Sequence, residues 1–285
     1  MPKPSRGGQR TRWANAYAQN QPTQPPQDED EDEDGIVVTK SADEDAEDAP
    51  KPQEIIEDEA KLKYEDVDWD NKQFPQLSSS EYTQVYRDNQ ASYNKNGNIV
   101  NAKKMYESPN AKPGTGGYSY SQDLNHRLNA GLPLDADSRF MSKYMTMGMH
   151  PIGKDCMLVR GAHDTLLNQI LAKAGLKGGY ESYSEAQIKT AIVGAEFQTK
   201  AFGSYGANDS KNPFIGGSQS GGRELIIHAE TASSTKVIVG ARAQEEFITG
   251  IGQNARVMDF KFSNDYAMPR GGGYKRVAHL YIRQW

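Results

Sequence analysis

The spacing of the apolar residues changes near the middle of the chain. Between residues 78 and 193 most of them recur every three or four positions, as in helices with one buried face. The predicted helices span 78–93, 124–132, 138–149, 164–174 and 184–193. The predicted strands, which are β-branched or alternating, span 157–161, 194–206, 225–228, 237–239, 255–262 and 277–282. Because helices come first and short strands follow, the pattern predicts an α+β fold.

The first 70 residues lack the apolar side chains that a core requires. Residues 1–27 are basic and then rich in Gln, Pro and Asn, and residues 28–70 hold 20 Asp and Glu against 4 Lys and Arg. We therefore predict a disordered tail over residues 1–70, with a basic start and an acidic continuation. The acidic part is either a solubilising tail, a nucleic-acid mimic, a docking segment for a basic partner or a packaging tether. The basic start is either a flexible terminus or a nucleic-acid contact.

The remaining chain divides into two predicted parts. Residues 71–117 are expected to form a loosely ordered extension, with a surface excursion over the Asn- and Gly-rich residues 93–117. Residues 118–285 are expected to form the main domain, since the periodic apolar pattern continues through them.

Cysteine and histidine usage excludes some kinds of site. Cys156 is the single cysteine, so no internal disulfide forms, and its apolar neighbours predict a buried filler. The five histidines are too scattered for a metal signature. No apolar stretch resembles a signal peptide or a membrane span, so we expect a protein of a reducing cytoplasm, or one packaged from it.

Three polar positions stand out at the predicted strands. Arg160 ends a buried strand and is followed by Gly161, an arrangement that suits a phosphate or carboxylate. Ser204 lies where the alternation of a strand breaks. Glu246 directly precedes the apolar pair Phe247 and Ile248. Taken singly, each also fits an ordinary surface role: a paired strand-end arginine, a bend, or a solvated strand start.

Two neighbouring segments add candidates. In a strand, residues two apart share a face, so Gln244 and Glu246 are expected to project together while Glu245 points away. The glycine-rich segment 216–222 precedes Arg223 and is either a loop that wraps a diphosphate or a plain linker, since it lacks the lysine and spacing of a P-loop.

In order and spacing, Arg160, Ser204 and Glu246 resemble the Arg-Ser-Glu class of mono-ADP-ribosyltransferases. The resemblance covers residues 118–285. Its motifs are Leu158-Val159-Arg160-Gly161, Phe202-Gly203-Ser204-Tyr205-Gly206, Gln244-Glu245-Glu246-Phe247-Ile248 and the helical segment from Tyr120 to Leu128. The second motif keeps the phenylalanine and first serine of Phe-x-Ser-Thr-Ser and loses the other two positions, which leaves open a weakened or inactive enzyme.

The resemblance implies a two-sheet β core with N-terminal helices, NAD as substrate, and a role for each motif residue. Glu246 would stabilise the oxocarbenium-like transition state and Ser204 would orient it. Arg160 would bind the diphosphate and ribose, and the backbone of Gly161 the nicotinamide amide. Arg223 is our candidate for a second phosphate contact.

The resemblance also bears on the acceptor and the source. Gln244 would face the acceptor, and an amide there resembles exoenzymes that modify asparagine in Rho proteins, so we expect a non-arginine acceptor. With its acidic extension the chain resembles transferases that tailed phages carry or inject to modify host proteins, placing it in a host cytoplasm or a virion. The alternatives are a non-enzymatic virion or assembly protein that keeps the fold as a scaffold, and a binding module whose activity resides in residues 28–70.

Overall fold

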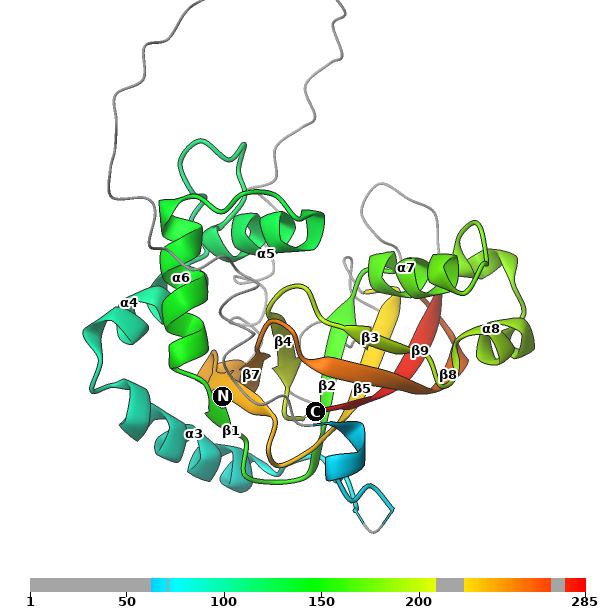
Figure 1. Cartoon of the computed structure of the whole chain (residues 1–285), viewed down its shortest axis with the longest axis horizontal. Coiled ribbons are helices and arrows are strands. Elements are labelled where there is room, and N and C mark those ends of the chain that lie inside the picture. Colours follow the sequence, from blue (N-terminus) through cyan, green and yellow to red (C-terminus); the bar gives the residue numbers. More distant parts are fainter. Residues whose placement is uncertain (1–62, 71, 209–222, 268–274) are drawn as a thin grey trace, which may run out of the picture.

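The computed structural model describes residues 63–70, 72–208, 223–267 and 275–285 (Figure 1). Its helices are α3 (Ser79–Tyr93), α4 (Gly97–Tyr106), α5 (Tyr120–Ala130), α6 (Ala136–Met147), α7 (Thr165–Lys173) and α8 (Glu185–Ile192). Its strands are β1 (His150–Pro151), β2 (Cys156–Ala162), β3 (Glu196–Gln198), β4 (Gly203–Gly206), β5 (Leu225–Thr231), β6 (Lys236–Val239), β7 (Glu246–Thr249), β8 (Asn254–Ala267) and β9 (Lys275–Gln284). The predicted α+β class is confirmed.

The strands form one sheet with a narrow junction in its middle. Their order is β1-β6-β7-β4-β2-β5-β9-β8-β3, antiparallel except for the pair β5 and β9. Within the described chain, β4 and β2 are paired at one position, Val159 opposite Gly206. Residues 75–77 occupy one side of this junction, because Met157 N–H donates to Pro75 O and Leu77 N–H donates to Ala207 O. The expected two sheets are thus two halves that this single pair connects.

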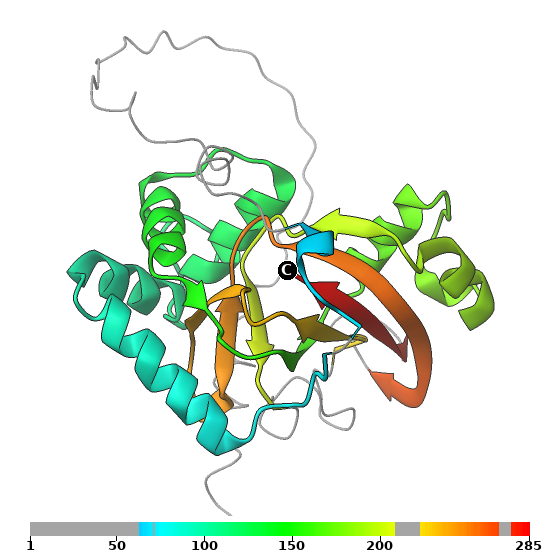
Figure 2. The same cartoon turned by 60° about the horizontal axis from the view of Figure 1, so that its bottom comes forward.

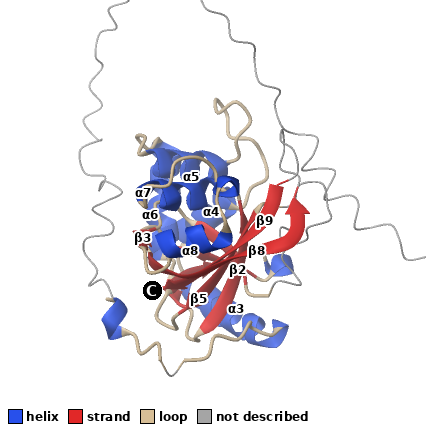
Figure 3. Ribbon diagram, turned by 90° about the vertical axis from the view of Figure 1, so that its right-hand side faces the viewer, coloured by secondary structure: helices blue, strands red, loops and turns tan. Residues whose placement is uncertain are grey.

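Each half of the sheet has its own helices. In Figure 1, α3 to α6 accompany the half from β1 to β4, and α7 and α8 accompany the other half. Helix α3 runs beside β6 in Figure 2, and in Figure 3 the strands pass between α3 and the helices α5 and α7. Tyr82 of α3 packs edge-on against Phe247 of β7, whereas Ile99 of α4 lies near Ile238 of β6. Because Ile238 is paired with Ile248, the neighbour of Phe247, these helices cover opposite faces.

Local signals in the sequence fix where several helices begin. A serine caps each of α3, α5 and α8, and the glutamate or glutamine three residues later bonds back to the serine's backbone. These capping boxes pair Ser78 with Glu81, Ser119 with Gln122, and Ser184 with Gln187. Gly131 ends α5 with φ 67°, a left-handed conformation that glycine adopts without steric cost.

Two segments are more ordered than the sequence predicts. Within the expected excursion 93–117, α4 forms, with Asn96 as its N-cap and an apolar stripe that includes Ile99 and Tyr106 buried in the main core. Three of its polar residues, Asn98, Asn101 and Lys104, are exposed, and such residues hide the apolar stripe when only composition is counted. The predicted tail also ends earlier than residue 70, because Trp69 is buried against Trp285 near the C-terminus. Residues 1–62 lie outside the described residues, so the rest of the tail stays a prediction.

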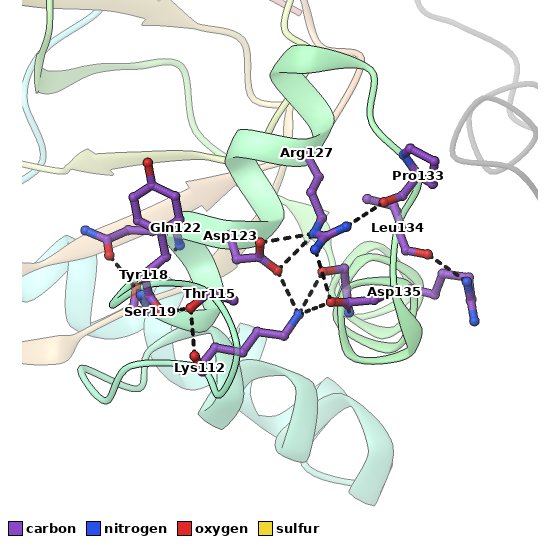
Figure 4. Close-up of polar contacts among 12 residues, drawn as sticks. Lys112, Thr115, Tyr118, Ser119, Gln122, Asp123, Arg127, Pro133, Leu134 and Asp135 are labelled. Atoms are coloured by element: carbon purple, nitrogen blue, oxygen red, sulfur yellow. Dashed lines mark hydrogen bonds and ion pairs between the residues drawn. The ribbon is translucent and has the colours of Figure 1, made fainter. Parts of the chain in front are cut away.

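A buried ion cluster ties the segment between α4 and α5 to both following helices (Figure 4). The ammonium of Lys112 lies 2.7 Å from the carboxylate of Asp123 and also bonds to Asp135. Arg127 donates to Asp123 at 3.0 Å. The side chains of Lys112 and Asp123 are each 6% exposed. Each charge has more than one partner, since Lys112 and Arg127 both contact Asp123 and Asp135, so the cluster fixes these segments relative to one another.

Two further expectations concern the chain as a whole. Cys156 is fully buried in the core, as predicted. Among the helices of the described residues, none has the length and apolar character needed to cross a membrane.

Candidate active site

Three neighbouring strands carry the three residues singled out from the sequence. Arg160 lies on β2, Ser204 on β4 and Glu246 at the start of β7, and these strands are adjacent in the sheet. Gly206 of β4 is opposite Val159 on one side and Glu246 on the other. All three residues are half-buried. Segments that are more than 40 residues apart along the chain are thus brought to the junction of the two halves.

Arg160 reaches across that junction. Strand β2 continues two residues beyond it, so Arg160 is close to the strand end and not the last residue. A Cβ on Gly203 would lie 2.9 Å from Nη1 of Arg160, and the guanidinium carbon is 5.8 Å from the ring centroid of Tyr205. Since side chains never approach a Cβ that closely, glycine at 203 makes room for the guanidinium over β4.

The carboxylate of Glu246 folds back onto the segment before its own strand. Its Oε2 accepts a 2.8 Å hydrogen bond from the N–H of Ala241. It also lies against Gly240, where a Cβ would be 2.3 Å from Oε2. On the backbone, Gly240 N–H donates to the carbonyl of Glu246, and so does the hydroxyl of Tyr82. Both ends of the residue are therefore fixed in place.

The expectation that Gln244 and Glu246 share one face of a strand is wrong. Residues Arg242–Gln244 form a 3-10 turn, and Glu245 adopts a left-handed conformation with φ 49° and ψ 48°. Glu245 is buried rather than pointing to solvent, and its Oε2 has no hydrogen-bond partner among the described residues. Gln244 is exposed on the turn. Strand alternation fails because the left-handed residue reverses the chain direction just before β7 begins.

Sequence reasoning missed a residue that contacts the site, Tyr106 at the end of α4. Its hydroxyl accepts a 3.1 Å hydrogen bond from Nδ2 of Asn125, and its ring packs edge-on against Phe202 at 5.7 Å. Burial is the main influence on the pKa of this tyrosine and raises it. Hydrogen bonding with Asn125 and Ser204 and the positive charge of Arg160 lower this pKa, whereas the negative charge of Glu246 raises it. The charges of Arg160 and Glu246 and hydrogen bonding with Ser204 thus all affect this buried hydroxyl. The helical spacing of Tyr106 indicates core packing but nothing of this contact.

Arg223 lies beyond the end of β2. It precedes β5, whose first residue Leu225 is opposite Ala162. Its guanidinium contacts Nε2 of His163, while Nδ1 of His163 lies 3.2 Å from the buried carboxylate of Glu224. Arg223 thus lies just before β5, at the end of the sheet that β2 reaches soon after Arg160. The glycine-rich segment 216–222 lies outside the described residues, so its predicted role is untested.

Comparison with known proteins identifies the fold. No protein-family model matches the sequence, and no curated protein matches it. The structure is similar to an ADP-ribosyltransferase from Clostridium botulinum (TM-score 0.52, 16% identity, 75% of this chain and 99% of that chain). It is also similar to the Clostridium limosum C3 exoenzyme (TM-score 0.53, 16% identity, 75% and 98%). An ADP-ribosylating toxin of C. perfringens, part of a binary enterotoxin and solved with NADH, aligns over 75% of this chain and 50% of its own (TM-score 0.50, 15% identity). The chain therefore has the ADP-ribosyltransferase fold.

Proposed function

We propose that this chain, which has the ADP-ribosyltransferase fold, is an NAD-dependent mono-ADP-ribosyltransferase. The observation that carries the proposal is the meeting of Arg160, Ser204 and Glu246 on three adjacent strands. A fold alone hosts many functions, so the argument depends on these side chains and their chemistry.

The proposed reaction transfers ADP-ribose from NAD to an acceptor. The bond between ribose C1′ and the nicotinamide nitrogen breaks, and nicotinamide leaves as a neutral molecule. C1′ then bonds to a nucleophilic atom of the acceptor, which loses a proton. Positive charge develops on the ribose before the new bond is complete. A carboxylate that is already held in place can stabilise this charge without reorganising, and Glu246 meets that requirement.

The other residues fit a dinucleotide with two phosphates. Arg160 is a half-buried cation held at the junction, and Arg223 directly precedes the adjacent strand β5. A guanidinium binds phosphate oxygens through paired N–H donors, so these two arginines suit the diphosphate. We assign the backbone of Gly161 to the nicotinamide amide and Ser204 to orienting Glu246.

The acceptor follows from the turn before β7. Gln244 is exposed two residues before Glu246, so it can contact a second molecule that approaches the carboxylate. An amide cannot deprotonate a guanidinium, which argues against arginine as the modified residue. We infer that the acceptor is a host macromolecule with another polar group, most simply a bacterial protein. From the composition of the N-terminal extension we further propose that the protein acts in a host cytoplasm or travels in a phage virion, and that its acidic segment 28–70 binds a basic partner.

The test is incubation of the full chain with labelled NAD and a bacterial lysate. The protein, Glu246→Gln and the control Glu181→Gln, which changes an exposed residue, are compared after circular dichroism has verified folding. We expect nicotinamide release and a labelled band from the protein and the control. Glu246→Gln should lose about a hundredfold or more in rate. Equal release from Glu246→Gln would refute the assigned role of Glu246. If none of the three proteins releases nicotinamide, the proposal that the chain is an enzyme is refuted, and the alternative of a non-enzymatic scaffold is favoured.

A further inference from the structure

A hydroxyl from outside the three motifs lies among their side chains. Tyr106 is 6% exposed and comes from α4, a helix in the part of the chain before the predicted domain. We propose that Tyr106, held by Asn125, positions the hydroxyl of Ser204 and through it the carboxylate of Glu246. This inference rests on the proposed function, because it assigns a positioning residue to the same reaction.

The amide of Asn125 fixes the Tyr106 oxygen relative to β4. Its Nδ2 donates to the Tyr106 hydroxyl at 3.1 Å, and its Oδ1 accepts the backbone N–H of Phe202 at 3.2 Å. The N–H of Phe202 can only donate, so it requires the amide oxygen at its side, and the amide nitrogen must then face Tyr106. Phe202 also packs edge-on against the Tyr106 ring, with the ring planes at 71°. Phe202, which directly precedes β4 and is two residues before Ser204, is therefore held against Tyr106 by an apolar contact and, through Asn125, by hydrogen bonds.

The second motif explains why an outside hydroxyl is needed. After Ser204 the chain has Tyr205 and Gly206 where hydroxyl residues could stand. The Tyr205 ring is buried beside Arg160, and glycine offers no side chain. Tyr205 has a hydroxyl, but consecutive strand residues project to opposite faces, so the motif gives Ser204 no hydroxyl neighbour on its own face of β4. Tyr106 supplies one from the side where its ring packs against Phe202, two residues before Ser204. Hydrogen bonding with Asn125 and with Ser204 also lowers the pKa of Tyr106. A serine that is bonded on one side keeps a narrower range of rotamers for its contact with the carboxylate.

The experiment is a double-mutant cycle on Tyr106→Phe and Ser204→Ala, measured by nicotinamide release from NAD. Tyr106→Phe removes one oxygen and keeps the ring against Phe202. We expect kcat to fall about tenfold with an unchanged KM for NAD, because one hydrogen bond that acts on the transition state is lost. The same change in the Ser204→Ala background should have no further effect, since Tyr106 acts through Ser204. The matched control is Tyr93→Phe, a buried tyrosine on α3, which should behave as the unaltered protein.

A second variant and a second readout keep the test decisive. If Tyr106→Phe fails to fold, Asn125→Ala is used instead, because it removes the amide that holds the Tyr106 hydroxyl. It should lower kcat by the same factor, and it should have no further effect in the Ser204→Ala background. Crystal structures without NAD should show the Ser204 hydroxyl and the Glu246 carboxylate displaced in Tyr106→Phe and unmoved in Tyr93→Phe.

Three results would overturn the inference while leaving the proposed function intact: full activity of Tyr106→Phe, additive losses in the cycle, or an equal loss in Tyr93→Phe. An unaltered protein that releases no nicotinamide would overturn both, and this outcome is separate from the other three.

Discussion

Replacing Gly240 with alanine tests whether the carboxylate of Glu246 works from the position it has in the structure. A Cβ at residue 240 would lie 2.3 Å from Oε2 and 2.6 Å from the carboxyl carbon of Glu246. Ordinary contact with a Cβ is 3.4–4 Å, so the carboxylate must move by about 1 Å or more. It would then leave the N–H of Ala241, with which Oε2 forms a 2.8 Å hydrogen bond.

The expected effects on stability and on rate differ in size. The group in the way is the far end of a flexible, half-buried side chain, so the fold can adjust. Losing one hydrogen bond to a charged group lowers the free energy of unfolding by about 1.5–3 kcal/mol at most. Misplacing a reacting group by about 1 Å can reduce a rate on the order of a hundredfold. Gly240→Ala should therefore keep its fold and lose most of its activity.

The assay combines nicotinamide release with urea denaturation. Gly97→Ala is the control, because nothing lies within 4 Å of a Cβ at that position. We expect unchanged kcat for Gly97→Ala and about a hundredfold lower kcat for Gly240→Ala. A Gly240→Ala protein with full kcat would refute the reasoning, since the carboxylate could then act from a different position.

The remaining predictions concern stability and reactivity. Lys112→Met should lower the free energy of unfolding by about 2 kcal/mol, because the buried Asp123 loses one of its two cationic partners and keeps Arg127. Lys154→Met, in an exposed pair, should change it by under about 1 kcal/mol, and equal effects in urea denaturation would contradict this reasoning. Burial raises the pKa of Asp135, but hydrogen bonding, chiefly with Lys112, brings that pKa down to about 2. A folded pKa below the unfolded value stabilises the protein above about pH 4, and this stabilisation is lost as the pH falls from about 4 to about 2. In Lys112→Met the free energy of unfolding should therefore fall less steeply between about pH 4 and about pH 2. The same slope as in the unaltered protein would contradict the role of Lys112 in lowering this pKa. Burial raises the pKa of the Cys156 thiol to about 12, so a thiol reagent at pH 8 should label it after denaturation but not before.

Sequence patterns predicted the features that depend on near neighbours. The start of α3 follows from Ser78 and Glu81, which bond to each other's backbone within one helical turn. The end of α5 follows from Gly131. Strand β2 was evident because its apolar run is unbroken from Cys156 to Val159. Each of these signals involves residues at most four apart, and for that reason a linear pattern contains them.

The features that failed depend on contacts between distant segments. Glu245 takes a left-handed conformation in a turn that is fixed from outside, where the N–H of Ala207 donates to its carbonyl. Left-handed positions are usually occupied by glycine or asparagine, so a glutamate there gives no local sequence signal for the turn. Helix α4 was hidden by its polar face. Tyr106 and Asn125 are 19 residues apart, and their bond exists only because the helices that carry them pack together.

The single pair between β2 and β4 also sets the mechanical character of the molecule. Arg160 belongs to one half of the sheet, and Ser204 and Glu246 belong to the other. A small rotation of one half against the other breaks few backbone bonds there, so this junction is the softest line through the sheet. A ligand that contacts Arg160 and Glu246 together would link the two halves and restrict their motion relative to each other. Part of its binding free energy would be spent on stiffening the sheet, and amide hydrogen exchange would slow on both sides at once.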